Sequence, residues 1–160
     1  MTTRRDPAER SSLRLFYRDW RLTRLGKLVN GAFAWLSGLG LTPCVLLTLQ
    51  VRGRRSGLLR TNVLAVAEHD GQRYLVSMLG DRSEWVRNVR AAGGEAFVKR
   101  GRSRPVKLTE VPAEERGPIL KAYCRVATSG RRHFPVPHDA PLSEFSAIAA
   151  DYPVFRIDPA

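Results

Sequence analysis

Cysteine is scarce in this sequence, and the two that occur, Cys44 and Cys124, lie in different segments without the spacing of metal ligands. Two thiols so placed are also too few for the disulfide framework of a small secreted protein. We therefore predict no metal site and no disulfide scaffold. A reducing, intracellular setting is the default for such a chain.

Long apolar runs are also rare. The segment Leu28–Val51 carries no charge and is long enough to cross a bilayer, but breakers and polar residues interrupt it: Asn30, Gly38, Gly40, Pro43 and Gln50. We interpret it as a helical part, a turn and a short strand rather than as a membrane span. Basic residues continue from Arg4 to Lys27 before any apolar stretch, so no cleavable signal peptide is evident.

Acidic side chains are in the minority, with 15 against 27 basic ones and a formal net charge of +12. Residues 1–60 hold 12 basic and three acidic groups, so most of the excess lies near the N-terminus. Only four of the basic residues are lysines. Forked recognition of phosphate or carboxylate would explain this arginine bias, and so would a genome rich in G and C. The charge predicts an anionic partner and leaves nucleic acid, a membrane surface and a phosphorylated ligand open.

The length of 160 residues predicts a single core with an N-terminal arm. Apolar residues recur at helical spacing from Leu13 to Trp20 and again from Leu25 to Leu36. We predict that residues 1–40 form a helical arm. The favoured interpretation packs this helix on the core with a basic face in solvent, and the alternative lays it on anionic lipid.

From Cys44 onward the hydrophobic period changes toward two, which is typical of strands. The predicted strands are Cys44–Val51, Leu59–Ala67, Arg73–Met78, Glu95–Arg100, Arg104–Val111 and Val154–Ile157. Helices are predicted over Ser83–Ala92, from Pro112 to Cys124 and over Ser143–Ala150, with a loop over Thr128–Pro141. Consecutive strands with short turns indicate an antiparallel sheet. An α+β fold built on a small barrel follows.

The densest chemical signal lies where the first strand turns into the second, in Gly53-Arg-Arg-Ser-Gly-Leu-Leu-Arg60. The glycines permit close approach of the backbone, whose amides can point at an anion, and Arg54, Arg55 and Arg60 supply forked donors. The pattern is typical of an anion cradle, and equally of a polar hairpin whose arginines face water. It is not a Walker motif, because no Lys-Ser/Thr pair and no helix follows.

Motifs follow one another in a fixed order: Val45–Gly57, Arg60–Leu64, Asp70-Gly71, Trp85–Asn88 and Arg90–Gly94. In this order and spacing they resemble the deazaflavin-dependent nitroreductase family, over about residues 25–111. The resemblance implies a split antiparallel β-barrel of the FMN-binding type, with an N-terminal helix and flanking helices. In that interpretation residues 41–160 form the cofactor-binding domain.

The resemblance implies binding of the deazaflavin coenzyme F420, with FMN as the alternative cofactor. It also implies hydride transfer from the reduced ring to a quinone, a nitroaromatic or another unsaturated acceptor. The residues that match the family's cofactor positions are Arg54, Arg55, Ser56, Arg60, Asn62, Val63, Leu64, Ser77, Met78, Leu79, Trp85, Val86 and Asn88. F420 carries a phosphodiester and several glutamates, so a basic chain would attract it.

Hydride transfer requires little of the protein beyond positioning the cofactor, so we assign no catalytic residue. If the reduced acceptor takes up a proton, His133, His138 and Tyr123 are candidate donors. Asp81 and Glu84 are better explained as caps of the helix near Trp85 than as catalytic carboxylates.

Two alternatives to an F420-dependent oxidoreductase stay open. One is a protein that binds F420 or FMN without turnover. The other is a basic nucleic-acid-binding protein, which is disfavoured because the sequence has no helix-turn-helix, zinc or RNA-binding signature. The resemblance further implies a small-molecule substrate and a homodimer. We expect a cytoplasmic location, with peripheral contact to the inner membrane through the N-terminal helix as a further hypothesis.

Overall fold

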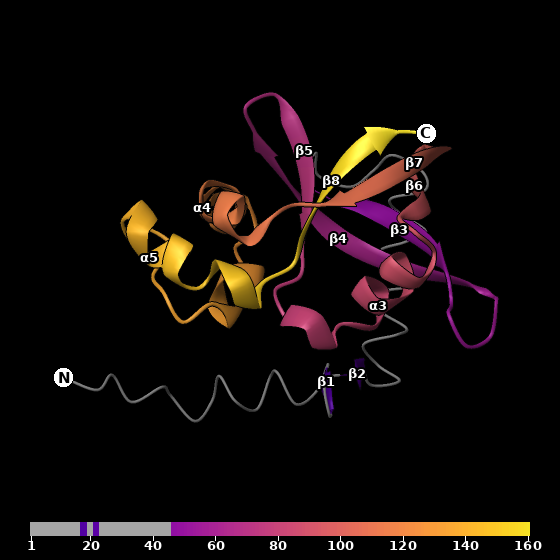
Figure 1. The fold of residues 1–160 in the computed structure, drawn as a ribbon, viewed down its shortest axis with the longest axis horizontal. Helices are drawn as coiled ribbons and strands as arrows, with labels where there is room; N and C mark the ends of the chain where they lie inside the picture. The colour runs from indigo at the N-terminus through magenta and orange to yellow at the C-terminus, as the bar shows by residue number, and fades with distance from the viewer. Residues whose placement is uncertain (1–16, 19–20, 23–45) are drawn as a thin grey trace.

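The computed structural model describes residues 17–18, 21–22 and 46–160. Six strands of the last range close into a barrel (Figure 1). They are β3 (Leu46–Arg52), β4 (Leu59–His69), β5 (Gln72–Val76), β6 (Glu95–Arg100), β7 (Arg102–Glu110) and β8 (Val154–Pro159). Their order around the barrel is β3-β4-β5-β8-β7-β6, and every neighbouring pair is antiparallel. The predicted α+β fold with a small antiparallel barrel is confirmed.

Local turn chemistry sets part of the register. Asp70 and Gly71 connect β4 to β5, and both have positive φ angles, 49° and 73°. A two-residue type I′ turn requires positive φ at both central positions, and the Asp-Gly pair suits it. This turn places His69 directly opposite Gln72.

One hydrophobic cluster fills the barrel, and helix α3 (Glu84–Ala91) completes it. Its buried members are Leu47, Leu49, Val51, Leu75, Trp85, Val86, Val89, Ala96, Val106, Leu108 and Phe155. The rings of Trp85 and Phe155 meet edge to face with their centroids 5.5 Å apart. Because the apolar face of α3 is buried in this cluster, the polar face of the helix is held in a fixed position beside the barrel.

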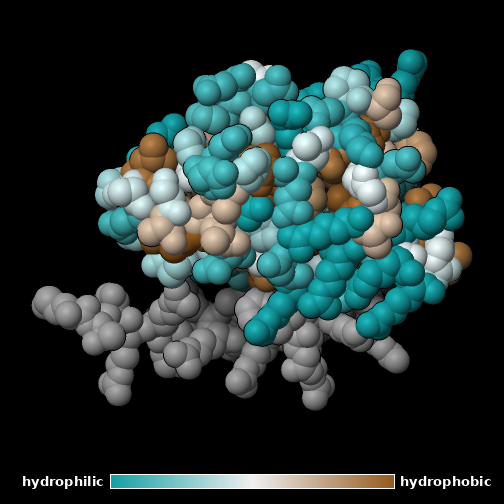
Figure 2. All heavy atoms as spheres, viewed as in Figure 1, coloured by the Kyte–Doolittle hydropathy of each residue, from teal (hydrophilic) through white to brown (hydrophobic). Residues whose placement is uncertain are grey.

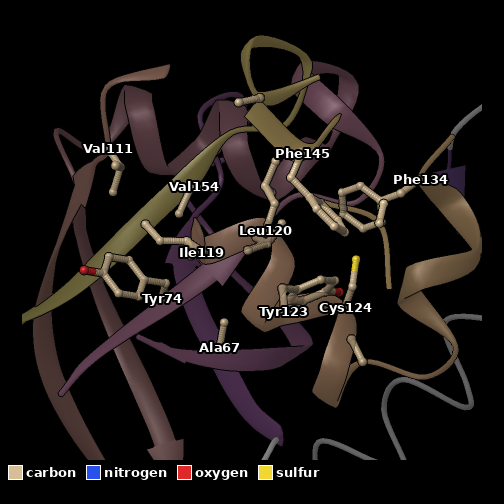
Figure 3. Packing of buried hydrophobic residues seen from close by; sticks show 14 residues of the cluster. Ala67, Tyr74, Val111, Ile119, Leu120, Tyr123, Cys124, Phe134, Phe145 and Val154 are labelled. Atoms are coloured by element: carbon tan, nitrogen blue, oxygen red, sulfur yellow. The ribbon is translucent and has the colours of Figure 1, made fainter. Parts of the chain in front are cut away.

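A second cluster lies between the outer surface of the barrel and the C-terminal helices (Figure 3). Helices α4 (Arg116–Val126) and α5 (Leu142–Ala147) supply Leu120 and Phe145, whose side chains are fully buried. Short 3-10 turns complete the connections: η1 (Gly80–Arg82), η2 (Ala113–Glu115), η3 (Gly130–His133) and η4 (Ala149–Asp151).

The predicted boundaries differ from the observed ones in two informative places. Strand β5 ends at Val76, not at Met78, because the Ser77 side chain donates a hydrogen bond to the carbonyl oxygen of Gly80 (2.8 Å) and the chain turns there. The predicted loop over Thr128–Pro141 contains η3 and buries Phe134, which packs against aromatic rings of the second cluster.

The helical arm predicted for residues 1–40 lies mostly outside the described residues. Within it, β1 (Tyr17–Arg18) and β2 (Arg21–Leu22) are two-residue strands that pair antiparallel. The prediction of a helix through these four residues is wrong, since cross-strand pairing requires extended backbone. Among the described residues, no helix has the length and apolar character needed to cross a membrane.

Candidate functional site

The β3–β4 connection, residues 53–58, is a compact turn stabilised by its own backbone. The amide of Gly53 donates to the carbonyl oxygen of Leu58 and the amide of Gly57 donates to that of Gly53, each at 2.8 Å. Gly57 has a φ angle of 67°, which glycine adopts at little cost. The sequence between β3 and β4 therefore folds as a defined loop that holds its arginines in place.

Arg54 is tied to helix α3 through both its backbone and its side chain. Its amide donates to Asn88 Oδ1 (3.2 Å), and Nη1 donates to the same oxygen (3.1 Å) and to Glu84 Oε2 (2.9 Å). The Asn88 residue is only 5% exposed. The hydrogen bond to Glu84 raises the pKa of Arg54. Arg54 thus fastens the turn to α3 and is ion-paired with Glu84.

Ser56 and Arg60 form a second pair on the exposed side of the turn. Arg60 Nη2 donates to Ser56 Oγ at 3.2 Å, and the amide of Leu58 contacts the same oxygen at 3.4 Å. Arg55 is exposed, as are Ser56 and Arg60. Hydrophilic side chains gather over this turn and α3 on the face shown in Figure 2. Of the three predicted cradle arginines, Arg55 and Arg60 are the ones placed to meet an anion from solvent.

The predicted residues of β4 divide between two faces of the strand. Asn62 lies opposite Leu49, and Leu64 lies opposite Leu47, so both share the inward face. Val63 lies opposite Thr48 on the other face. Since successive side chains alternate, these three residues do not present their side chains to one common surface.

Ser77, Met78 and Leu79 follow β5 and lead into η1. The hydroxyls of Ser77 and Ser83 lie 2.7 Å apart in a buried hydrogen bond, just before α3 begins. Met78 and Leu79 are half-buried, and Met78 packs against the second cluster. This segment positions the start of α3, whose side chains Trp85 and Val86 are buried in the barrel and therefore serve packing.

The candidate proton donors lie in or near the second cluster. Tyr123 is 4% exposed, and its hydroxyl contacts Met78 Sδ at 3.9 Å. His133 is half-buried in η3, and His138 is exposed in the loop that follows. Tyr123 thus contacts Met78, which is one of the predicted cofactor residues. The described part of the chain holds no group of three or more His, Cys, Asp or Glu side chains placed to bind a metal ion.

Sequence reasoning missed the role of the charged side chains around α3. Asp81 and Glu84 were expected to cap this helix, but its N-cap residue is Ser83, and no side-chain hydrogen bond caps the helix there. Asp81 instead pairs with Arg90 (2.7 Å), and Glu84 pairs with Arg54. The spacing of Arg54 and Glu84 in the sequence gives no signal of this contact, because 30 residues separate them.

A cavity of about 270 Å³ lies elsewhere, where β4, β5, β7 and β8 meet η2 and the start of α4. Its lining is His69, Asp70, Tyr74, Thr109, Glu110, Val111, Pro112, Glu115, Ile119 and Arg156. None of the predicted cofactor residues belongs to this lining. The cavity and the β3–β4 turn are therefore separate features of the surface.

Comparison with protein families gives one match: a model of the F420H(2)-dependent quinone reductases covers residues 34–133. This range includes all predicted cofactor residues. The comparison with curated proteins gives no match.

Solved structures of similar fold have low sequence identity. A domain-swapped dimer has a TM-score of 0.51 at 16% identity, over 84% of this chain and 94% of its own. The protein Atu2129 of unknown function from Agrobacterium tumefaciens has a TM-score of 0.52 at 12% identity, over 79% of this chain and 53% of its own. An F420-H2 dependent reductase (FDR-A) has a TM-score of 0.48 at 20% identity, over 72% of this chain and 95% of its own. At such identities the first two likenesses concern the fold alone.

Proposed function

The chain belongs to the F420H(2)-dependent quinone reductase family, and on that premise we propose that it is an oxidoreductase that passes a hydride from reduced F420 to an acceptor. The acceptor classes we propose are quinones, nitroaromatics and other unsaturated compounds. The observation that carries the proposal is the β3–β4 turn, which α3 holds through Arg54 while Arg55 and Arg60 remain exposed.

The donors of this turn fit the anionic part of F420. A phosphodiester and a glutamate tail need several cationic or hydroxyl donors near one another, and forked guanidinium groups bind such oxygens in pairs. Arg55, Arg60 and Ser56 would hold this part of the coenzyme, and Arg54 would act indirectly by keeping the turn against α3. Arg60 already donates to Ser56, which orients its guanidinium group.

The remaining predicted residues would orient the coenzyme rather than react. F420 supplies the hydride when it is bound, so the protein needs no nucleophile or metal for that step. Asn62 and Leu64 on one face of β4, or Val63 on the other, would contact the ring. The Ser77–Ser83 hydrogen bond would keep α3 in register with them. The assignment of Ser77, Met78, Leu79, Trp85, Val86 and Asn88 to the cofactor site stays a prediction.

Fluorescence titration with F420 tests the role of the turn. We expect Arg55→Ala and Arg60→Ala each to weaken binding by about tenfold or more, since each removes a charge-assisted hydrogen bond. Arg100→Ala and Arg102→Ala are matched controls. Both are exposed, and the β3–β6 register places them near the opposite end of β3. Equal affinities for all four variants and the unchanged protein would refute the assignment.

Turnover and cofactor choice need separate measurements. Oxidation of reduced F420 should be followed with menadione and with nitroaromatic compounds as acceptors. F420 binding without turnover on a broad panel would favour the alternative of a non-catalytic F420-binding protein. Tighter binding of FMN than of F420 would favour FMN as the cofactor. Retention on DNA without binding of either coenzyme would favour the nucleic-acid alternative.

Assembly and location stay predictions. The proposed homodimer is measurable by light scattering of the purified protein. The cytoplasmic location and the contact of the N-terminal helix with the inner membrane are measurable by fractionation, with carbonate washing of the membrane pellet to identify peripheral attachment.

A further inference from the structure

The hairpin of β6 and β7 carries positive charges that have no ion-pair partner. Lys99, Arg100, Arg102 and Arg104 lie on the two sides of the turn at Gly101, and all three arginines are exposed. Among the described residues, no acidic side chain lies within ion-pairing distance of any of the four. The positive charge of this hairpin therefore faces solvent uncompensated.

The register of the hairpin brings two of these charges together. Arg100 lies directly opposite Arg102, and like charges at opposed positions destabilise a sheet. The other directly opposed charged pairs of the barrel have opposite signs: Glu68 with Arg73, Glu95 with Lys107, and Lys107 with Asp158. An anion on the hairpin would relieve the repulsion between Arg100 and Arg102. The register thus points to an anionic partner independently of the number of charges.

An exposed apolar pair lies on the same hairpin. Phe97 is directly opposite Pro105; Phe97 is 43% exposed, and Pro105 is exposed as well. Ala96 and Val98 pack in the barrel cluster, so the alternation of the strand places Phe97 on the outer surface. Phe97 belongs to neither hydrophobic cluster of the described residues. Its exposure has no explanation in the packing of the fold.

Three kinds of partner would meet positive charge on such a surface. A symmetric contact with a second copy would bring the same arginines together from both chains, which is repulsive. Single-stranded nucleic acid stacks successive bases on several aromatic rings, and Phe97 is the one aromatic residue among the exposed large apolar side chains of the described residues. A membrane of anionic lipids fits both features, because its headgroups attract arginines and its interface accepts an aromatic ring.

We propose that the β6–β7 hairpin docks on an anionic lipid membrane, with Arg100, Arg102 and Arg104 at the headgroups and Phe97 at the boundary with the acyl chains. Phe97 and Arg100 are about 10 Å apart along the strand, and long arginine side chains can reach the headgroups while the ring lies deeper. Figure 1 shows β6 and β7 on the side of the barrel away from α4 and α5.

This surface lies near the opposite end of β3 from the β3–β4 turn. The inference therefore does not depend on F420 chemistry, and it uses no residue of the N-terminal arm. Titrations with F420 contain no lipid, so Arg100 and Arg102 keep their role as controls there.

Sedimentation of the full chain with vesicles tests the proposal. Vesicles of phosphatidylcholine with about 30% phosphatidylglycerol are compared with vesicles of phosphatidylcholine alone. We expect binding to the anionic vesicles to be stronger by about tenfold or more, and to weaken as salt is raised. The double variant Arg100→Ala, Arg102→Ala should bind the anionic vesicles about tenfold more weakly or worse, because it removes two cations from the contact.

The matched control for charge is the double variant Arg125→Ala, Arg132→Ala. Both arginines are exposed, and they lie in α4 and η3 rather than in the hairpin. The control loses the same net charge, and we expect its vesicle binding to change by less than about threefold.

The apolar part of the contact is tested separately. Phe97→Ala should weaken binding to the anionic vesicles by about three- to tenfold, since it removes the ring from the interface. Phe97→Trp keeps an aromatic ring and should retain the binding. Thermal unfolding establishes that each variant is folded, and the Arg100→Ala, Arg102→Ala protein should be no less stable because the opposed like charges are gone.

Several outcomes would overturn the proposal. Equal binding to both kinds of vesicle, equal effects of the two double variants, or unchanged binding of Phe97→Ala would each do so. A dimer that light scattering detects without vesicles and that Phe97→Ala dissociates would assign the surface to a second copy instead. Tighter binding of a DNA oligonucleotide than of anionic vesicles, lost in the Arg100→Ala, Arg102→Ala protein, would assign it to nucleic acid.

Discussion

The thiol of Cys124 is fully buried in the cluster between α4 and the barrel. Burial raises the pKa of Cys124 from 9.0 to about 11, although the positive charge of Arg131 acts in the opposite direction. The folded state therefore binds this proton more tightly than the unfolded chain does. The resulting stabilisation is fully present below pH 9 and is lost as the pH rises through about 11.

The raised pKa of Cys124 makes the stability of the protein with Cys124, relative to that with Cys124→Ala, depend on pH. Unfolding by urea should be measured for the Cys44→Ser background and for Cys44→Ser with Cys124→Ala, between about pH 8 and pH 11. We expect the free-energy difference between the two proteins to shrink toward the upper end. In the same Cys44→Ser background, Cys124 should react with a disulfide reagent at pH 8 only as fast as the protein opens. A constant difference across the range, with rapid labelling, would contradict burial of the thiol.

Individual residues are also where sequence reasoning was least complete. Arg54, Arg55 and Arg60 look equivalent in a basic turn, and the sequence predicts the same role for each. Asn88 and Glu84 distinguish them, since they bind Arg54 and leave the other two exposed. That distinction depends on contacts between residues about 30 positions apart. Local pattern carries no information about such contacts, so the proposal that Arg55 and Arg60 meet the anion required the fold.

At the scale of the element, α3 joins the turn to the rest of the molecule. Its apolar face is buried in the barrel, Asn88 holds the turn, and near its other end Arg90 is paired with both Asp81 and Glu110. These hydrogen bonds raise the pKa of Arg90, the largest effect coming from Glu110. Glu110 in turn accepts a hydrogen bond from Arg116, which is buried at the start of α4. One helix therefore links the candidate cofactor site to the second cluster.

Among the side chains of α3, we expect Asn88 to contribute most to holding the β3–β4 turn in place. Asn88→Ala removes the acceptor of the Arg54 amide, and we expect it to lower the free energy of unfolding by about 1–3 kcal/mol. Asn88→Asp keeps an oxygen at that position and should recover much of the loss. The matched control is Arg87→Ala, one residue earlier on the exposed face of the helix, which should change stability by less than about 0.5 kcal/mol. Denaturant unfolding measures all three, and equal losses for Asn88→Ala and Arg87→Ala would contradict the role of Asn88.

Elements were the part of the fold that the sequence predicted best. The strand over Glu95–Arg100 has the predicted bounds, and the helix predicted over Ser83–Ala92 is observed over Glu84–Ala91. Both lie between glycine or serine residues that mark their ends locally. Apolar residues at helical spacing from Leu13 to Trp20 predicted a helix, but this spacing does not exclude the observed pairing of β1 with β2. The hydrophobic period is a local property of the sequence, whereas the pairing of two strands depends on both segments.

At the scale of the whole molecule, the closure of the barrel is not readable from local pattern alone. Short turns predict that β3 pairs with β4 and that β4 pairs with β5. The placement of β8 between β5 and β7 joins segments from distant parts of the chain. The family resemblance implied a split barrel but covers only about residues 25–111, so it did not place β8, and no local signal in the sequence pointed to the cavity beside α4. Its lining comes from β4, β5, β7, β8 and α4, which meet only after the barrel has closed.

The distribution of charge over the whole molecule leads to the last prediction. The chain has a net charge of +12, and the exposed arginines of the β3–β4 turn contribute to a basic surface there. Attraction of a polyanion by exposed charges is screened by salt, since the Debye length falls from about 10 Å at 0.1 M to about 3 Å at 1 M. We therefore expect F420 to bind about tenfold more weakly when sodium chloride is raised from about 0.05 M to about 0.5 M.

The salt dependence also separates the turn from the overall charge. In the double variant Arg55→Ala, Arg60→Ala, the same change in salt should weaken F420 binding much less, because the nearest exposed charges have been removed. A double variant of Arg100 and Arg102 loses the same net charge and should keep the full salt effect, since these residues lie near the opposite end of β3. Fluorescence titration at several salt concentrations measures both slopes. If the two double variants lose the salt effect equally, net charge rather than the β3–β4 turn attracts the coenzyme, and the proposed cradle has no special electrostatic role.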